Sequence, residues 1–338
     1  MIDAERRRPD GRGRICIKNR YILVDWPDGG TEVAAHVGSP EPNQARRSGG
    51  SKTMIAVTGA SGHLGRRVIE NLLERGVEPG RLVAIARSAE KVRDLADRGV
   101  EVRQADYERP ETLGPALAGV ETLVLVSGSE LGRRLPQHRN LVEAAKAAGV
   151  RLIAYTSILN AGTSGMQLAT EHLATEELIR ASGIPFVFLR NSWYLENYTG
   201  NLGSALEHGA LLGSAGGGRV SAATRADYAA AAAEAAIGSG HENRVYELGG
   251  DDSFTLAELA EIISTESGKP VVYRDLPEEE YARALLGFGL PEPIARMLAD
   301  SDVGIARGEL FTDSGDLHRL IGRATTPPRE AVAAALRG

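Results

Sequence analysis

An alternation of short apolar segments and helical patterns from residue 54 onward predicts an α/β protein built on a doubly wound parallel sheet. The apolar runs are separated by stretches with helical spacing, such as 64–76 and 138–150. Runs that are apolar throughout suit strands that helices cover on both faces. Glycines follow the helical stretches, where a left-handed cap needs them. The expected strands are 54–58, 82–86, 100–104, 122–127, 151–157, 185–190 and 245–249.

After about residue 190 the alternation loosens. Helical patterns at 255–268 and 277–289 are joined by a single strand-like segment at 271–274. We therefore expect residues 54–190 to form the sheet domain. Residues 191–338 should form a smaller α/β lobe on the substrate side, with a strand or two returning to the main sheet. A ligand cleft between the two is the default expectation.

The first 53 residues fall outside this pattern and are expected to be a disordered or spurious extension. They hold 10 Lys and Arg against 7 Asp and Glu, and 37–52 is rich in Gly, Ser, Pro and charge, which is typical of a linker. A short strand is possible at 20–26. Three interpretations stay open: translation starts at Met54, the segment is a flexible tail, or it is a basic arm that binds a partner.

Charge and cysteine content disfavour several classes of function. The 338-residue chain has a formal net charge of −6, and residues 54–338 hold 29 Lys and Arg against 38 Asp and Glu. An acidic globular part argues against binding to nucleic acid. No apolar run reaches the roughly 18 residues of a membrane span. The single cysteine is Cys16, so the globular part has no cysteine metal site or disulfide, which fits the cytoplasm. We expect no bound metal.

The stretch MIAVTGASGHLG, residues 54–65, places three glycines between the first strand and the first helix. Glycines in this position allow a tight turn, close approach of a pyrophosphate and close packing of the helix. Amides at the helix N-terminus then favour the anion. The spacing is wider than G-x-G-x-x-G, so an ordinary glycine-rich turn is the alternative. The sequence thus predicts a Rossmann-type dinucleotide-binding domain whose turn is Gly59, Ala60, Ser61, Gly62, His63 and Leu64.

The residues after the second predicted strand favour NADP over NAD. In NAD-binding sheets an acidic residue at this point holds the ribose hydroxyls. Here the strand 82–86 is followed by Arg87, with no acid at its tip. An arginine can hold the additional phosphate of NADP through two parallel hydrogen bonds, although a solvated surface arginine is the alternative. Asp106, after the third strand, is expected near the adenine.

Small polar and aromatic side chains follow the later strands. Ser127 and Ser129 can contact a nicotinamide ribose without crowding it, or they can simply cap the loop. The segment 190–198 gathers three aromatic residues and two asparagines, which offer faces for stacking a ring and donors to carbonyl oxygens. The same aromatics could close the core between the two lobes. Arg225 precedes an alanine-rich helix, either in a helix cap with a salt bridge or in the cleft wall.

The segment 157–183 lacks the proton-donating pair of the larger short-chain dehydrogenase class, a Tyr-x-x-x-Lys on the helix after the fifth strand. His172 is the residue of this helix that can exchange a proton near neutral pH, although a lone histidine on a helix is more often structural or solvated. Reduction of an alcohol-forming carbonyl needs a strong proton donor. A reduced quinone is a stabilised phenolate that can take its proton from water. The sequence thus predicts an easily reduced acceptor or no catalysis.

From Met54 onward the chain resembles the type 2 NAD(P)H:quinone oxidoreductases, bacterial members of the NmrA-like branch of atypical short-chain dehydrogenases. The resemblance lies in TGASGHLG, VRQADY, LPQHRN, AAKAAGV, IAYTS, LRNSWYLENY, ATRADYAAAAA, RVYEL and DSDVG. It implies NADPH as cofactor and hydride delivery to quinones; residues 1–53 have no counterpart. The implied cofactor contacts beyond the glycine turn are Arg87, Asp106, Ser127, Gly128, Ser129, Asn191, Ser192 and Arg225. The substrate-side candidates are Trp193, Tyr194, Asn197 and His172.

Two functional hypotheses follow. The leading one is an NADPH-dependent oxidoreductase that transfers a hydride to quinones, with no catalytic residue assigned because the transfer is direct. The alternative is an NmrA-like, dinucleotide-binding redox sensor without turnover. An epimerase-like enzyme is disfavoured by the missing tyrosine–lysine pair. The expected partner is a small-molecule quinone, and the expected state is a cytoplasmic monomer or homodimer.

Overall fold

The computed structural model describes residues 6–7, 14–18, 21–25, 31–36 and 53–337. Residues Met1–Lys52 and Thr53–Gly338 are two separate units. The described part of the first unit is an antiparallel sheet, where the sequence predicted one possible strand in an otherwise disordered extension. Apart from β3, these strands hold few strongly apolar residues, so they did not stand out as apolar runs. The strands, in sheet order, are β1 (Arg6–Arg7), β2 (Arg14–Lys18), β3 (Tyr21–Asp25) and β4 (Thr31–His36).

The strand at 20–26 corresponds to β3, and the linker expected at 37–52 lies outside the described residues.

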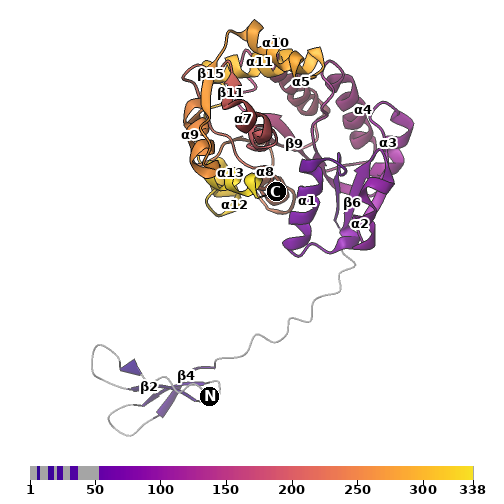
Figure 1. Cartoon of the computed structure of the whole chain (residues 1–338). Helices are drawn as coiled ribbons and strands as arrows, with labels where there is room; N and C mark the ends of the chain where they lie inside the picture. Colours follow the sequence, from indigo (N-terminus) through magenta and orange to yellow (C-terminus); the bar gives the residue numbers. More distant parts are fainter. Residues whose placement is uncertain (1–5, 8–13, 19–20, 26–30, 37–52, 338) are drawn as a thin grey trace. The chain divides into compact units, whose positions relative to one another are not determined.

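A seven-stranded sheet, parallel throughout, organises the second unit (Figure 1). Every strand expected in the sequence is present, which confirms the α/β, doubly wound fold. The first strand of this unit lies inside the sheet, with the next two strands of the chain on one side of it and the later strands on the other. Such a switch point leaves a crevice at the carboxyl ends of the strands. In sheet order the strands are β13 (Arg244–Leu248), β10 (Phe186–Asn191), β9 (Leu152–Ile158), β8 (Val120–Leu125), β5 (Met54–Val57), β6 (Leu82–Ala86) and β7 (Glu101–Gln104).

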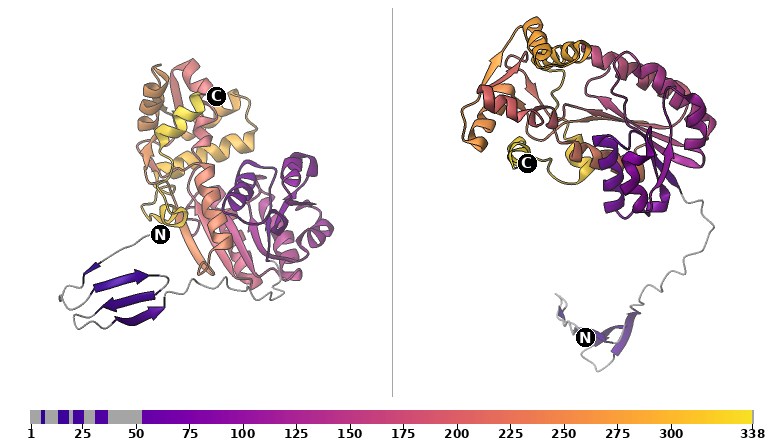
Figure 2. Two further views of the ribbon diagram at one scale, coloured as in Figure 1. Left: turned by 90° about the horizontal axis from the view of Figure 1, so that it is seen from below. Right: turned by 45° about the vertical axis from the view of Figure 1, so that its right-hand side comes forward.

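Helices cover both faces of this sheet (Figure 2). One apolar core lies between the sheet and α1 (His63–Glu74), α2 (Arg93–Asp97), α8 (Arg225–Ile237) and α12 (Asp316–Ile321). The other lies between the sheet and α3 (Pro110–Leu117), α4 (Arg134–Ala147) and α5 (Gln167–Ser182). Two single 3-10 turns, η1 (Pro79–Arg81) and η2 (Ala89–Val92), flank β6. The continuous apolar runs in the sequence follow from this double coverage.

The alanine-rich segment predicted as a packed helix is α8, which lies against α1. Its alanines from Ala229 to Ala233 are at most 5% exposed. Small side chains let two helix backbones approach closely, so α8 supports α1 along its length. Thr224 caps the helix by accepting a hydrogen bond from the Asp227 N–H at 3.1 Å.

The second half of the chain packs around a further apolar core, the lobe core, which it shares with residues of β9 and α5. Figure 1 shows the helices of this half gathered on one side of the unit and α1 to α4 on the other. One strand of this half, β13, lies in the main sheet. The remaining elements are α6 (Glu196–Thr199), α7 (Leu202–His208), β11 (Ala210–Gly213), β12 (Arg219–Val220), β14 (Phe254–Thr255), α9 (Leu256–Ser267), β15 (Val272–Asp275), α10 (Glu278–Gly287), α11 (Glu292–Ala306) and α13 (Pro328–Leu336).

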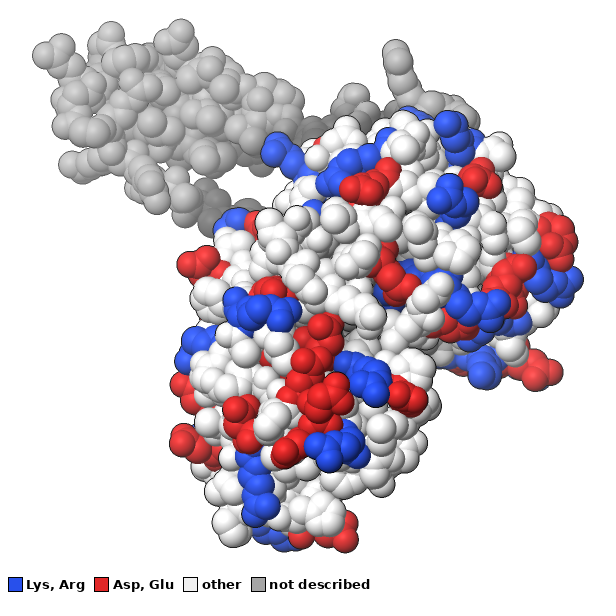
Figure 3. All heavy atoms as spheres, turned by 90° about the horizontal axis from the view of Figure 1, so that it is seen from above, with Lys and Arg blue, Asp and Glu red and all other residues white. Residues whose placement is uncertain are grey.

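The surface carries charges of both signs. On the face drawn in Figure 3, Lys and Arg side chains alternate with Asp and Glu side chains over the described residues. In the part of the chain that the structure describes, no helix combines the length and apolarity that crossing a membrane requires.

The second half of the chain buries the acidic side chain of Asp302. Asp302 of α11 is 5% exposed, and its Oδ2 accepts a hydrogen bond from the Ser214 N–H at 2.9 Å. Burial, together with the nearby charge of Asp275, raises the pKa of Asp302 to about 7. The folded protein therefore favours the protonated carboxyl.

We predict that Asp302→Asn becomes more stable relative to the native chain as the pH rises. An aspartate whose pKa is raised in the folded state adds to the free energy of unfolding. This added stability is fully present below the unfolded pKa of about 4 and is lost as the pH rises through about 7. Asparagine keeps the uncharged shape. The difference in unfolding free energy should shift by about 2 to 4 kcal/mol in favour of the variant between pH 4 and pH 8. Urea unfolding at both pH values measures it, and a constant difference would contradict the prediction.

Candidate active site

A cavity of about 560 Å³ lies at the carboxyl ends of β5, β6, β8, β9 and β10. This volume is within the usual range for a small-molecule site. Seventeen of the eighteen residues that the sequence predicted for cofactor or substrate line it. They are Gly59, Ser61, Gly62, His63, Leu64, Arg87, Asp106, Ser127, Gly128, Ser129, His172, Asn191, Ser192, Trp193, Tyr194, Asn197 and Arg225.

Ala60 is the predicted residue that does not line the cavity. Its side chain is fully buried, and its N–H donates to the Ile85 carbonyl at 3.1 Å. This backbone hydrogen bond joins the glycine turn to β6. The side chain of Ala60 fills the core beneath the turn.

Two positions of the glycine turn favour glycine, one because of its backbone conformation and the other because of close packing. Gly59 has a φ of +60°, in the left-handed region that favours glycine. A Cβ on Gly65 would lie 2.4 Å from the Gly59 carbonyl oxygen and 2.8 Å from the Thr58 carbonyl oxygen. The first turn of α1 can therefore pack directly on the end of β5.

The N-terminus of α1 faces the cavity without a side-chain cap. Its N-cap residue is Gly62, and its first turn holds no acidic residue. His63 and Leu64 follow it in the cavity wall. Amides with no capping partner at a helix N-terminus, together with the helix dipole, favour an anion such as a phosphate.

Arg87 lies at the end of the cavity beyond β6. Its side chain is 71% exposed, and its Nη1 donates to Glu130 Oε1 at 3.2 Å. Burial raises the pKa of nearby Tyr107 to about 12, so its hydroxyl stays neutral. The carboxylate of Asp106 accepts a hydrogen bond from the Glu108 N–H at 3.0 Å and so stabilises the loop after β7.

The segment after β8 is held by side chains of α4. His138 Nε2 accepts a hydrogen bond from the Gly128 N–H at 3.0 Å, and Arg134 Nε donates to the Gly128 carbonyl at 2.9 Å. Burial and the Arg134 charge lower the pKa of His138 to about 3. His138 is therefore neutral, carries its proton on Nδ1 and faces Thr175 Oγ1 at 3.1 Å.

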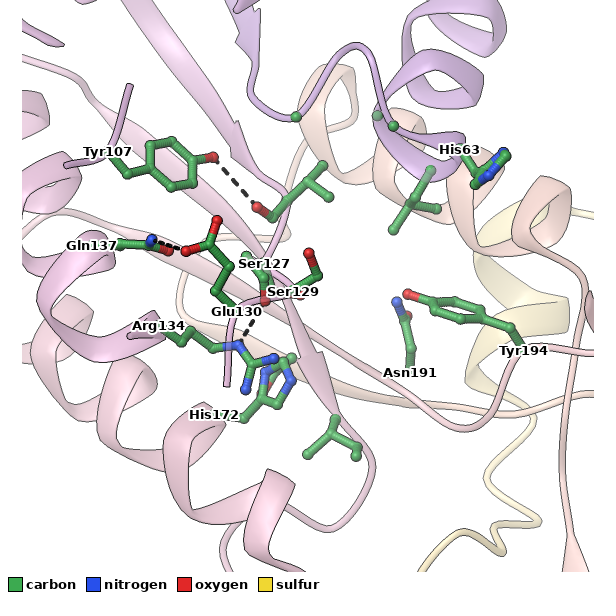
Figure 4. A pocket seen from close by; sticks show the side chains of 18 of the residues that line it. His63, Tyr107, Ser127, Ser129, Glu130, Arg134, Gln137, His172, Asn191 and Tyr194 are labelled. Atoms are coloured by element: carbon green, nitrogen blue, oxygen red, sulfur yellow. Dashed lines mark hydrogen bonds between the residues drawn. The ribbon is translucent and has the colours of Figure 1, made fainter. Parts of the chain in front are cut away.

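Arg134 is a buried cation in the cavity wall, only 4% exposed. Its Nη1 pairs with Glu171 Oε2 at 2.6 Å. His172 lies on the same side of the cavity (Figure 4), and its Nδ1 is 2.8 Å from the Tyr155 hydroxyl. Burial, followed by the charge of Arg134, lowers the pKa of His172 well below its usual value. His172 is therefore a neutral side chain at physiological pH.

Asn191 presents a buried acceptor without a partner. The residue is 4% exposed, and among the described residues nothing donates to its Oδ1. Figure 4 shows Asn191 on the cavity wall near Tyr194. Because a buried polar atom without a hydrogen bond is costly, Oδ1 indicates a place where a ligand donor binds.

Arg225 and Tyr194 form a further part of the wall. The Arg225 guanidinium lies 4.6 Å from the centre of the Tyr194 ring, and its Nη2 donates to Asn197 Oδ1 at 2.9 Å. Ser192 donates its hydroxyl to the Leu310 carbonyl at 2.7 Å, so this hydroxyl proton is already used within the protein. The sequence left open whether 190–198 lines the cleft or closes the core; Trp193 does both, because it also belongs to the lobe core.

Several lining residues were not predicted from the sequence. An apolar portion of the wall includes Leu131, Ile158, Leu168 and Met297, which come from the segment after β8 and from β9, α5 and α11. Single apolar residues of this kind carry no local signal. Glu130, Arg134 and Gln137 were also missed, although Gln137 lies within the segment LPQHRN.

The model of the NmrA-like family matches residues 51–309. The chain belongs to the NmrA-like family. Quinone oxidoreductase 2 of Escherichia coli (strain K12) is 53% identical over 279 residues, which cover 82% of this chain and 97% of that protein.

Two solved structures extend the comparison within this fold. The NADPH-dependent quinone oxidoreductase of Escherichia coli, complexed with NADPH, is 52% identical with a TM-score of 0.82, covering 84% of this chain and 100% of that one. The triphenylmethane reductase of Citrobacter sp., complexed with NADP(H), is 44% identical with a TM-score of 0.79, covering 83% of this chain and 99% of that one. The chain is therefore similar to NmrA-like proteins solved with this dinucleotide.

We predict that Gly65→Ala lowers the free energy of unfolding of this NmrA-like chain by about 1 to 3 kcal/mol, because the added methyl overlaps the backbone of the turn. Gly114→Ala is the matched control, since a Cβ at Gly114 meets nothing within 4 Å in helix α3 and alanine favours the helix. Chemical denaturation of both variants measures the effect. Equal stability of the two variants would contradict close packing at Gly65.

Proposed function

We propose that this protein is an NADPH-dependent oxidoreductase that transfers a hydride to quinones. The observation that carries the proposal is the 53% identity to a quinone oxidoreductase over 97% of that protein's length. The glycine turn, the cavity at the carboxyl ends of the strands and Arg87 agree with a bound NADP-type dinucleotide.

The residues present fit NADPH. Gly65 lets α1 pack directly on the backbone of Thr58 and Gly59, and the uncapped N-terminus of α1 offers amides to a pyrophosphate. Arg87 would hold the additional phosphate, and the small residues Ser127 to Ser129 leave space along the cavity. The buried acceptor Asn191 Oδ1 suits an N–H donor such as the carboxamide of nicotinamide.

Reduction of a quinone to a hydroquinone takes up one hydride and one proton. When bound, NADPH supplies the hydride. The apolar wall with Leu168 and Met297 would hold the quinone ring and exclude water, and Trp193 and Tyr194 would offer aromatic faces. Solvent water can protonate the stabilised phenolate.

His172 would donate a hydrogen bond to the quinone oxygen that gains negative charge. A neutral His172 that accepts the Tyr155 O–H at Nδ1 carries its proton on Nε2. No hydrogen bond joins Nε2 to a residue that the structure describes, and His172 lines the cavity. The buried Arg134 adds positive potential on the same side. Both groups are fixed before the substrate arrives, which is the arrangement that stabilises a developing charge.

A dinucleotide-binding regulator without turnover is not favoured, because the similar proteins named above are oxidoreductases and reductases. Location in the cytoplasm, a monomeric or homodimeric state and the boundary near residue 190 stay predictions.

We predict that the purified full-length chain oxidises NADPH in the presence of a simple benzoquinone. Loss of the absorbance of reduced nicotinamide measures the reaction, with a mixture without protein as control. Turnover no faster than this control, in a sample that binds NADPH, would contradict quinone reduction and favour the sensor.

We predict that Arg87→Gln weakens NADPH binding about tenfold or more and changes NADH binding less than about threefold, because only NADPH carries the additional phosphate. Titration followed by fluorescence or calorimetry gives both dissociation constants. Arg93→Gln is the matched control, since it removes an equal charge at an exposed position that does not line the cavity. Similar losses for the two dinucleotides would show that Arg87 does not contact the phosphate.

A further inference from the structure

A carboxylate lies beside Arg87, at the end of the cavity where we propose that the additional phosphate of NADPH binds, although no acid follows the second strand. Glu130 comes from the segment between β8 and α4, far from Arg87 in sequence. Its Oε1 accepts a hydrogen bond from Arg87 Nη1 at 3.2 Å, and both residues line the cavity. The structure thus places beside Arg87 the kind of acid that NAD-binding sheets use for ribose hydroxyls.

Glu130 is fixed in this place by bonds on both sides of it in the chain. On one side, the Gly128 N–H and carbonyl bind His138 and Arg134. On the other side, the Gly132 N–H donates to Glu171 Oε1 at 2.7 Å. The segment that carries Glu130 is therefore tied to α4 and α5.

The side chain of Glu130 is also oriented. Gln137 Nε2 donates to Glu130 Oε2 at 3.1 Å, which leaves Oε1 for Arg87. Figure 4 shows Gln137 and Glu130 joined at the wall of the cavity. Gln137 also donates to Glu108 at 3.1 Å, and Glu108 pairs with Arg133 at 2.7 Å. Glu130 is the member of this network that joins it to Arg87.

We propose that Glu130 is a specificity-determining residue that limits the preference for NADPH over NADH by competing with the 2′-phosphate for Arg87. This inference rests on the proposed function. The phosphate and the carboxylate are both anions that bind the same guanidinium, so NADPH binds at the expense of the Arg87–Glu130 contact. NADH carries ribose hydroxyls here, which can donate to the carboxylate.

The effect of Glu130 on the two affinities is limited by how exposed the Arg87–Glu130 ion pair is. The Arg87 side chain is 71% exposed and that of Glu130 is 38% exposed. Ion pairs this accessible are weak and screened by salt. Glu130 is thus expected to change affinities by several-fold, not by orders of magnitude.

The test compares dissociation constants for NADPH and NADH in the full-length protein, without quinone and at low salt. Glu130→Gln keeps the shape and an acceptor for Gln137 but removes the charge. The ratio of the NADH constant to the NADPH constant should rise at least threefold, mainly because NADPH binds more tightly. A smaller rise, or a fall, would overturn the proposal.

Glu108→Gln is the matched control. It removes an equal charge from the same network, but Glu108 does not line the cavity or contact Arg87. For Glu108→Gln, the ratio of the NADH constant to the NADPH constant should stay within twofold of the native ratio. A rise equal to that of Glu130→Gln would show a general charge effect and overturn the proposal.

A double-mutant cycle tests whether Glu130 acts through its contact with Arg87. In the Arg87→Gln background, Glu130→Gln should raise the ratio by no more than half as much as in the native background, on a logarithmic scale. A larger rise would mean that Glu130 acts without Arg87, against the proposal. If the native chain binds neither dinucleotide, the proposed function itself fails. If it binds both but Glu130→Gln leaves the ratio unchanged, only this inference fails.

Discussion

The site depends on the close approach of helix α1 to the end of β5, which only glycine at position 65 permits. A Cβ there would lie within 2.8 Å of three backbone atoms of Thr58 and Gly59. Because α1 begins directly after the turn, its amides face the cavity at the switch point of the sheet. The phosphate site that we propose thus consists mainly of backbone, and its position follows from how closely two elements pack.

The opposite wall is built from side chains of α4 and α5. His138 and Arg134 bind the backbone of Gly128, and Glu171 binds both Arg134 and Gly132. Since burial keeps His138 neutral over the physiological pH range, its acceptor nitrogen remains available to Gly128. The segment after β8 therefore keeps one position, although it belongs to no helix or strand.

Local patterns in the sequence predicted the elements well and their long-range contacts poorly. The strands of the main sheet and the glycine turn have apolar runs and spacing that need no other part of the chain. Arg87 was found because it follows a strand directly. Met297 reaches the cavity from a distant helix. Glu130 follows the predicted Ser129 directly, but only the fold brings it beside Arg87. Strand β1 consists of two arginines, β2 has a basic residue at each end, and β4 holds one large apolar residue, Val33, so none of them stood out as an apolar run.

The buried alanines of α8 pack against α1, so a change in their side-chain volume, far from the cavity, would affect the glycine turn. Ala229 to Ala233 are almost completely buried, and α8 lies against α1. Interiors packed at this density have no free space for an added methyl group. A larger side chain in place of one of these alanines would displace α1 along with the amides that it presents. The packing of α8 thus bears on the position of the glycine turn, even though these alanines do not line the cavity.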